Sequence, residues 1–316
     1  MEYRGIIISK SVSNKPSLSS RAVASKQAGS DSVVSVSNNS VVITKQQILI
    51  LAYIYWFRFV STKQLQFLLG KKQIQQVQQR LNLLLGRGWI GRNFSTLDRL
   101  TGRYASYYLL PGGTKALKRY KFKLGFELEL DPKVLHAIYK DKTASSRFIN
   151  RCLGVGDINC SLRQLHGNEL EFFSKTEIAS DNYLPELRPD AYLRLTNSSK
   201  VKPSETEYLL EYCEETTPFW VHRKRLKQYI EYNDEGLWQD QTARAFPTIL
   251  LVAENTVLQR RLQRFIKRIT AEIWADDLRF YVSNKELLAT AKPNEAIWTE
   301  YEEDEEVMRL RTLEQV

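Results

Sequence analysis

The stretch from Lys72 to Gly91 decides the fold of the first half of the chain, and it reads KQIQQVQQRLNLLLGRGWIG. Its aliphatic residues recur at the spacing of one helix face, at Ile74, Val77, Leu81, Leu84 and Leu85. Two glycines follow, and then an apolar run of strand type. The pattern therefore predicts a helix over residues 72–85 that ends in a turn and leads directly into a β-strand.

Two helix-start signals precede this stretch. Thr44-x-x-Gln47 and Ser61-x-x-Gln64 are both capping boxes, in which the first side chain and the fourth satisfy each other's backbone N–H groups. Downstream, residues 89–94 and 104–110 alternate as two strands around a loop over 95–103, and a further helix is expected over 114–120. Three helices followed by a β-hairpin is the order of a winged helix-turn-helix, which we predict for residues 44–124.

The charge of this region is strongly one-sided. From Lys45 to Lys123 there are 15 basic residues and a single acid, Asp98. The whole chain of 316 residues carries 46 basic and 36 acidic residues, a net charge of +10, but the part through Phe126 holds +17 and the remainder −7. A folded domain with this imbalance is stabilised by a polyanion, and phosphate contacts that release counterions would serve.

The outward face of the 72–85 helix and the hairpin carry the side chains that can read or grip DNA. Amide side chains hydrogen-bond adenine, arginine hydrogen-bonds guanine, and lysine holds phosphates. The predicted DNA-binding residues are Lys71, Lys72, Gln75, Gln78, Gln79, Asn82, Arg92, Arg99 and Arg103. A solvated helix face could have the same composition, so the prediction of double-stranded DNA as partner depends on the helix order and the charge together.

The second half of the chain alternates strands and helices. Strands are expected over 170–173, 190–195, 208–213, 248–252 and 278–282, and helices over 144–165, 220–232 and 257–275, the first of them interrupted by Gly154 and Gly156. This pattern predicts an α/β domain with a mixed sheet. The complete chain is therefore expected to be of α+β or α/β class, with a winged helix-turn-helix followed by a mixed-sheet domain.

Two acids on neighbouring strands form a candidate site. Asp190 lies in Arg188-Pro189-Asp190-Ala191, and Glu211 lies in the apolar run 208–213. An acid among apolar neighbours is costly unless a positive charge compensates it. Asp190 and Glu211 could share Mg²⁺, which takes one or two protein carboxylates. Alternatively, Glu211 could simply bridge Arg188 or Arg223.

The order of these motifs resembles two known groups of proteins. Pro-Asp followed by an acid on the next strand is similar to the PD-(D/E)xK nuclease core, which implies a restriction-endonuclease-like fold. The winged helix, Pro189-Asp190-Ala191, Glu211 and a basic helix that ends in Arg225-Leu226-Lys227-Gln228-Tyr229 together resemble the replication-relaxation family, over about residues 44–288. That resemblance implies a role in plasmid or mobile-element replication and DNA relaxation, with replication or mobilisation proteins as further partners.

One position departs from both patterns. Where the nuclease pattern has lysine two residues after the second acid, this chain has Cys213, and a thiol of ordinary pKa is a poor substitute. Lys224 or Lys227 on the following helix could supply the missing charge, and Asp157, Glu214 and Glu215 are further candidate ligands. Two functions therefore stay open: a DNA-binding protein with Mg²⁺-dependent nicking, in which Asp190, Glu211, Lys224 and Lys227 are catalytic, or a non-catalytic DNA-binding regulator or relaxosome-type accessory.

Composition and motifs argue against several other classes of protein. The three cysteines form no C-x-x-C pair, no G-x-x-x-x-G-K-[ST] phosphate loop is present, and the longest apolar run, residues 48–57, is half of what a membrane span needs. We therefore expect a cytoplasmic protein that does not span a membrane. The expected divisions are a flexible Ser-rich arm (1–43), the winged helix (44–124), a connector with a short acidic strand (125–142), the nuclease-like domain (143–289) and an acidic tail (290–316).

Overall fold

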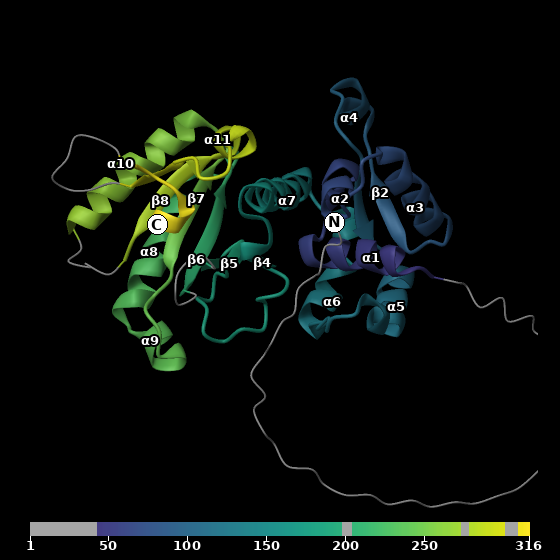
Figure 1. The fold of residues 1–316 in the computed structure, drawn as a ribbon, viewed down its shortest axis with the longest axis horizontal. Helices are drawn as coiled ribbons and strands as arrows, with labels where there is room; N and C mark the ends of the chain where they lie inside the picture. Colours follow the sequence, from purple (N-terminus) through teal and green to yellow (C-terminus); the bar gives the residue numbers. More distant parts are fainter. Residues whose placement is uncertain (1–42, 198–203, 273–277, 301–308) are drawn as a thin grey trace, which may run out of the picture.

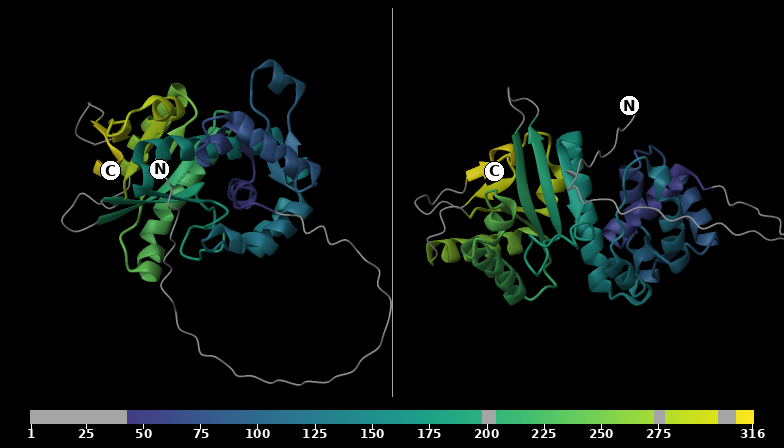
Figure 2. Two further views of the ribbon diagram at one scale, coloured as in Figure 1. Left: turned by 45° about the vertical axis from the view of Figure 1, so that its right-hand side comes forward. Right: turned by 90° about the horizontal axis from the view of Figure 1, so that it is seen from below.

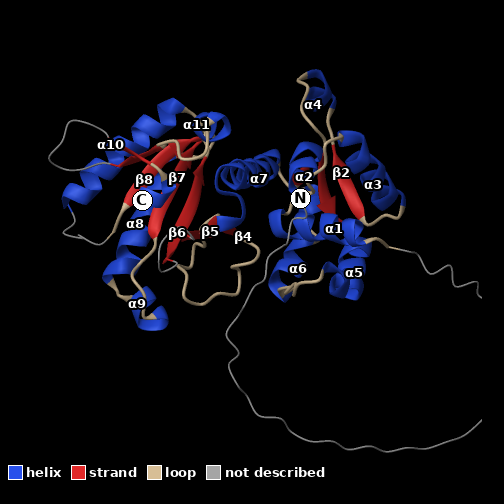
Figure 3. Cartoon of the chain, viewed as in Figure 1, coloured by secondary structure: helices blue, strands red, loops and turns tan. Residues whose placement is uncertain are grey.

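The computed structural model describes residues 43–197, 204–272, 278–300 and 309–316 (Figure 1). These residues form a three-stranded and a seven-stranded sheet, each with its own helices (Figure 3). The arm predicted over 1–43 lies outside the described residues except for Ile43, which is buried.

Three helices open the described chain, as the sequence predicts. They are α1 (Lys45–Phe57), α2 (Thr62–Leu68) and α3 (Ile74–Gly86). Both capping boxes form, because the side chains of Thr44 and Ser61 accept from the backbone N–H of Gln47 and Gln64, and these glutamines accept in return. On α3, Val77, Leu81 and Leu84 are buried, so the aliphatic face predicted from their spacing is the inward face.

A small antiparallel sheet completes this region. Its strands are β1 (Val60–Ser61), β2 (Ile90–Asn93) and β3 (Ser106–Leu109), in the order β1-β3-β2. The connection predicted as a loop contains a short helix, α4 (Thr96–Leu100), because the Ser95 hydroxyl accepts from the N–H of Asp98 as an N-cap does. Helix α5 (Pro111–Tyr120) follows the hairpin. The predicted order of helices and hairpin is thus present. That this region is a winged helix-turn-helix stays a prediction.

The short acidic strand expected in the connector does not form, and the acidic residues before Pro132 are irregular. Helix α6 (Pro132–Ile138) follows, because the Asp131 side chain accepts from the N–H of Val134 and Pro132 occupies the first helical turn. Two short 3₁₀ turns, Lys121–Leu124 and Asp141–Thr143, flank it. The guanidinium of Arg58 forms an ion pair with the Asp141 carboxylate, which ties the connector to the end of α1.

Helix α7 (Ser146–His166) runs unbroken through the two glycines that were expected to interrupt it. A Cβ atom at Gly154 would lie 2.3 Å from Cε1 of Tyr212, and one at Gly156 would lie 2.9 Å from Nε2 of Gln64. Each glycine therefore lies where the helix backbone closely approaches another side chain, Tyr212 in one case and Gln64 of α2 in the other. Figures 1 and 2 show α7 between the α1–α6 region and the large sheet.

The large sheet is mixed, as predicted. Its strands are β4 (Leu170–Ser174), β5 (Ala191–Asn197), β6 (Ser204–Cys213), β7 (Thr248–Ala253), β8 (Phe280–Asn284), β9 (Trp298–Glu300) and β10 (Arg309–Arg311), in the order β10-β9-β8-β7-β6-β5-β4. The β6–β7 and β7–β8 pairs are parallel and the others antiparallel.

Helices cover both faces of this sheet. Helices α8 (Phe219–Asp234) and α10 (Thr256–Glu272) pack on one face around Leu209, Leu226 and Leu262, whereas α7 packs on the other around Tyr212 and Leu162. The cluster of buried side chains that includes Tyr212 and Leu162 continues from α7 into α1–α3. The small and large sheets therefore share this apolar core. Two shorter helices, α9 (Leu237–Thr242) and α11 (Lys285–Thr290), complete the described fold.

The acidic tail predicted from residue 290 onward begins inside the sheet, which corrects the boundary at 289. Trp298 on β9 is fully buried, and the Tyr208 hydroxyl donates to the carbonyl of Leu313 at 2.7 Å. Most of the acidic run that starts at Glu300 lies outside the described residues. Within the described ranges, no helix is both long enough and apolar enough to span a membrane.

Candidate functional site

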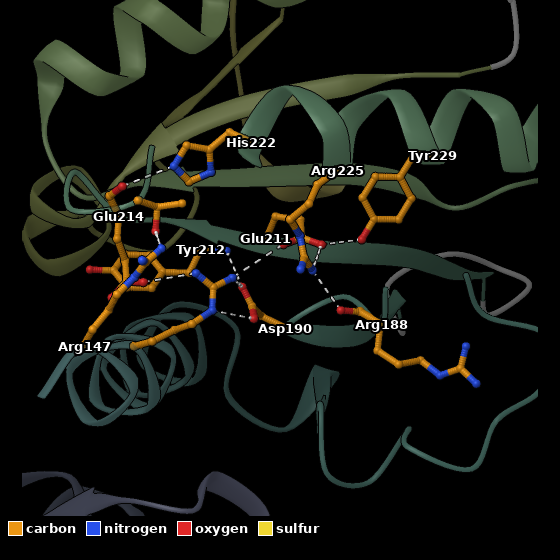
Figure 4. Close-up of polar contacts among 11 residues, drawn as sticks. Arg147, Arg188, Asp190, Glu211, Tyr212, Glu214, His222, Arg225 and Tyr229 are labelled. Carbon is orange, nitrogen blue, oxygen red and sulfur yellow. Dashed lines mark hydrogen bonds and ion pairs between the residues drawn. The ribbon is translucent and has the colours of Figure 1, made fainter. Parts of the chain in front are cut away.

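The sheet brings Asp190 and Glu211 together, as their sequence context suggests. Asp190 immediately precedes β5, and Glu211 lies on β6. Ala191 is in register with Leu210, and the N–H of Asp190 donates to the Leu210 carbonyl at 2.9 Å. The Asp190 carboxylate in turn accepts from the backbone N–H of Tyr212 at 2.9 Å (Figure 4).

Arg151 of α7 holds three carboxylates at once. Its Nη2 lies 2.5 Å from Oδ2 of Asp190, and its Nε lies 3.2 Å from Oδ1 of the same group. Its Nη1 donates to Oε2 of Glu214 at 3.2 Å, and Nη2 lies 3.8 Å from Oε2 of Glu211. A fork of N–H donors can meet a carboxylate in this two-bond manner, which makes the pair stronger and more directional than a point charge would.

Glu211 is also held from the opposite face of the sheet. Nη2 of Arg225 lies 2.5 Å from its Oε1 and also donates to the carbonyl of Arg188 at 2.8 Å. The Tyr229 hydroxyl donates to the same Oε1 at 2.5 Å. Because Arg225 and Tyr229 are four residues apart on α8, both side chains point from one helix face toward β6 (Figure 4).

Both carboxylates are almost completely removed from water, with Asp190 3% and Glu211 2% exposed. Burial by itself would raise the pKa of Asp190, but the positive charges of Arg151, Arg225 and Lys175 outweigh it, so its pKa lies below the ordinary value. Asp190 is therefore an ionised carboxylate held by arginine. In a buried pair of this kind, each charge depends on its partner, and removing one partner is strongly destabilising.

Glu214, His222 and Arg147 lie at one end of the cluster of charged side chains around Asp190 and Glu211. Burial raises the pKa of Glu214 despite the opposing charge of Arg151. Burial lowers the pKa of His222, whose Nε2 lies 3.2 Å from the Glu214 carbonyl, so a neutral ring with the proton on Nε2 would donate to it. Nη2 of Arg147 donates to the Thr217 hydroxyl at 3.0 Å and closes the same end of the cluster (Figure 4).

The Mg²⁺ site predicted at Asp190 and Glu211 does not fit this arrangement. The oxygens that would bind the cation already accept from Arg151, Arg225, Tyr229 and a backbone N–H. Among the described residues, no three His, Cys, Asp or Glu side chains are grouped as a metal site. The guanidinium groups stand where a metal ion would have to enter, and they supply the compensating charge.

Lys224 and Lys227 do not reach the carboxylates, which corrects their predicted catalytic role. Both are exposed on the solvent side of α8, because the helix turns Arg225 toward the sheet instead. The suggested pairing of Glu211 with Arg188 or Arg223 is also wrong: the Arg188 side chain donates to the carbonyls of Leu184 and Pro185, and Arg223 is exposed.

Cys213 is buried beside Leu209 in the core under α8. Burial raises the pKa of its thiol, so the group is neutral. Of the further candidate ligands, Glu214 belongs to the cluster, whereas Glu215 accepts from Asn255 and Asp157 accepts from Gln64 and Lys285.

The residues predicted to contact DNA lie at the surface of the small-sheet region. They come from the start and outward face of α3, from β2 and from the β2–β3 connection. Those exposed are Lys72, Gln75, Gln78, Gln79, Asn82, Arg92, Arg99 and Arg103, while Lys71 is partly buried. Arg80, between them, folds its guanidinium back onto the Gln76 carbonyl at 2.6 Å.

Arg151 was missed by the sequence analysis, and Arg225 and Tyr229 were noticed only as part of a motif. The spacing of Arg225 and Tyr229 on a predicted helix could have shown that both face the sheet. Arg151 had no such signal, because its partners are 39 and 63 residues away along the chain.

A family model described as replication-relaxation matches residues 51–249. No curated protein matches the sequence. Among solved structures, a restriction endonuclease FokI bound to DNA is similar at 15% identity and a TM-score of 0.28, over 77% of this chain and 43% of that one. The present chain thus spans less than half of that nuclease. Because the family match extends over well more than half of the sequence, this protein belongs to the replication-relaxation family.

Proposed function

We propose that this protein binds double-stranded DNA through α3 and the β2–β3 hairpin, and that the domain of the large sheet serves as a non-catalytic accessory. The observation that carries the second part is the engagement of Asp190 by Arg151 and of Glu211 by Arg225. Family membership supports a role in the replication of plasmids or mobile elements, together with replication or mobilisation proteins.

The DNA-binding part of the proposal is supported by chemistry on α3. Its exposed side carries the amide side chains of Gln75, Gln78, Gln79 and Asn82 beside the exposed Leu83, and it contains no acid. The single acid of the region, Asp98, accepts from the N–H and the hydroxyl of Ser95 at 2.9 Å and 2.6 Å. It therefore serves as a local cap inside an otherwise basic surface, which leaves the imbalance of charge to attract phosphates.

The non-catalytic part is supported by the state of the two carboxylates. A metal-dependent nuclease needs carboxylate oxygens free to bind the ion, and a general base needs a pKa near the working pH. Asp190 has a lowered pKa and two bonds to Arg151, so it meets neither requirement. Instead, the cluster fastens α7 and α8 to opposite faces of the sheet.

A Mg²⁺-dependent endonuclease is the second candidate, and one observation favours it. Asp190 and Glu211 lie on adjacent strands, as the acids of the PD-(D/E)xK pattern do. This function would require Arg151 to leave the carboxylates when metal and DNA enter.

A plasmid assay separates the two candidates. Supercoiled plasmid is incubated with the full chain and Mg²⁺ or Mn²⁺, beside Asp190→Ala and Glu211→Ala. We expect no nicking with any of the three proteins, while gel shifts with linear duplex show binding by all that fold. Nicking by the wild type that both variants lose would overturn the non-catalytic proposal and leave the DNA-binding one intact.

A further inference from the structure

One side of helix α8 faces away from the carboxylate cluster and lines a groove. Between α8 and α10 lies a groove of about 870 Å³. We call it the α8–α10 groove, and its principal lining residues are Trp220, Arg223, Lys224, Lys227, Phe265 and Arg268. Figure 1 shows the two helices on the side of the large sheet that faces away from α7.

The groove is positively charged in a domain whose total charge is negative. Arg223, Lys224, Lys227 and Arg268 line it, against Glu186 and Glu231. All four basic side chains are exposed, and within the described ranges none of them forms an ion pair. The guanidinium of Arg268 lies 5.3 Å from the ring of Phe265, which places its charge over the apolar floor. The local charge is therefore available to an anionic partner.

The indole ring of Trp220 lines the same groove. Trp220 is 60% exposed although it lies in the first turn of a helix whose inward face is fully packed. An exposed indole beside basic side chains can stack on a planar ring while the cations bind negative charge on the same ligand. Base–aromatic stacking next to phosphate contacts is how single strands are held without regard to sequence.

The loop that contains Glu186 and Leu187 also lines the groove, and it is bonded to α8. With its amide oxygen turned toward the loop, Gln228 accepts from the N–H groups of Glu186 and Leu187 at 3.3 and 3.1 Å. The same loop continues to Arg188, whose carbonyl accepts from Arg225 of the buried cluster. The ion pairs beneath α8 thus hold the helix and the loop that shape the groove, which reduces the ordering a ligand must impose.

We propose that the α8–α10 groove binds single-stranded DNA, with phosphates on Arg223, Lys224, Lys227 and Arg268 and one base stacked on Trp220. A duplex fits the groove less well, because its bases are already stacked and cannot offer a face to the indole. An acidic polypeptide would use the charges but leave Trp220 uncovered. The choice of DNA over RNA rests on the proposed function; the site itself is separate from α3.

The test measures fluorescence anisotropy of a labelled dT20 strand and of a 20-bp duplex with the full-length protein. The variants are Trp220→Ala, Trp220→Phe and the charge reversal Lys227→Glu. Arg260→Glu is the matched control, because Arg260 is exposed on the same helix, about 12 Å from Arg268 along the axis, and does not line the groove. Gln79→Ala on α3 is the control for the duplex site, and thermal melts show that each variant is folded.

We expect Trp220→Ala to weaken dT20 binding about tenfold, Trp220→Phe to retain most of it, and duplex binding to stay unchanged in both. The lysine reversal should weaken dT20 binding more than Arg260→Glu does. Equal affinity of wild type and Trp220→Ala for dT20 would overturn the proposal, as would tighter binding of rU20 than of dT20. Displacement of dT20 by poly-glutamate as effectively as by unlabelled dT20 would also overturn it, because the groove would then recognise charge alone. If Gln79→Ala loses duplex binding but keeps dT20 binding, the result supports the α3 site and shows that the α8–α10 groove binds independently of it.

Discussion

Arg151 and Asp190, 39 residues apart in the sequence, form a two-bond ion pair with Nη2–Oδ2 and Nε–Oδ1 distances of 2.5 and 3.2 Å. The pair joins α7, which lies between the small-sheet region and the large sheet, to the start of β5. The protein thus provides from its own chain the positive charge that the carboxylate requires. We propose that this ion pair makes the site a structural joint rather than a catalytic centre.

Removal of Arg151 should therefore destabilise the protein strongly. We expect Arg151→Ala to lower the free energy of unfolding by about 3–5 kcal/mol, because three buried or half-buried carboxylates lose their common partner. Urea denaturation followed by circular dichroism measures the loss. Arg147→Ala, which removes only a bond to Thr217, should cost about 1 kcal/mol. Equal losses in the two variants would contradict the role assigned to Arg151.

The half-buried Glu177 should make stability fall between mildly acidic and neutral pH. Burial raises the pKa of Glu177 to about 7, against the opposing bonds from Ser174. An acid whose folded pKa exceeds its unfolded one favours folding while protonated, so this contribution is present below about pH 4.5 and is lost as pH rises to about 7. Glu177→Gln should flatten that part of the stability curve, as urea midpoints from pH 5 to 8 would show. A wild-type curve that Glu177→Gln leaves unaltered would refute this.

Changes on α3 should separate base reading from phosphate binding. Gln79→Ala should cost about 1–3 kcal/mol on a preferred duplex and little on other sequences. Lys71→Ala/Lys72→Ala should weaken all duplexes alike and reduce the log–log salt slope by about 2 from a wild-type value near −4.5, expected for about five phosphate contacts. Gel shifts at several salt concentrations measure both effects, with exposed Lys115→Ala on α5 as the control. Affinity that does not vary with salt would exclude the proposed contacts.

Gly154 should tolerate no side chain. A methyl group there would meet the Tyr212 ring at 2.3 Å, so Gly154→Ala should destabilise the protein by about 1–3 kcal/mol through the displacement of α7 from β6. Gly86→Ala at the end of α3 meets nothing within 4 Å and should be neutral or slightly stabilising. Thermal melts of the two variants compare the sites directly, and a neutral Gly154→Ala would show that the helix can shift without cost.

The elements that depend on neighbouring residues could be predicted from the sequence. The capping boxes at Thr44 and Ser61 form as expected, because the groups that satisfy each other are three residues apart. The adjacency of Asp190 and Glu211 also followed from strand pairing, since both acids stand in recognisable strand runs. The prediction of an acidic strand in the connector was wrong, because this short alternating run has no partner strand in either sheet.

The sequence by itself determined most of the helices and strands around the site, the one-sided charge and the pair of acids, because hydrophobic period, capping and composition are local properties. The tertiary structure decided what those acids do. Whether a buried carboxylate meets a metal, a lysine or an arginine depends on which side chain the packing of distant helices brings within about 3 Å, and spacing along the chain does not encode that distance. Here the packing brought Arg151 and Arg225 to the acids and turned Lys224 and Lys227 toward the α8–α10 groove.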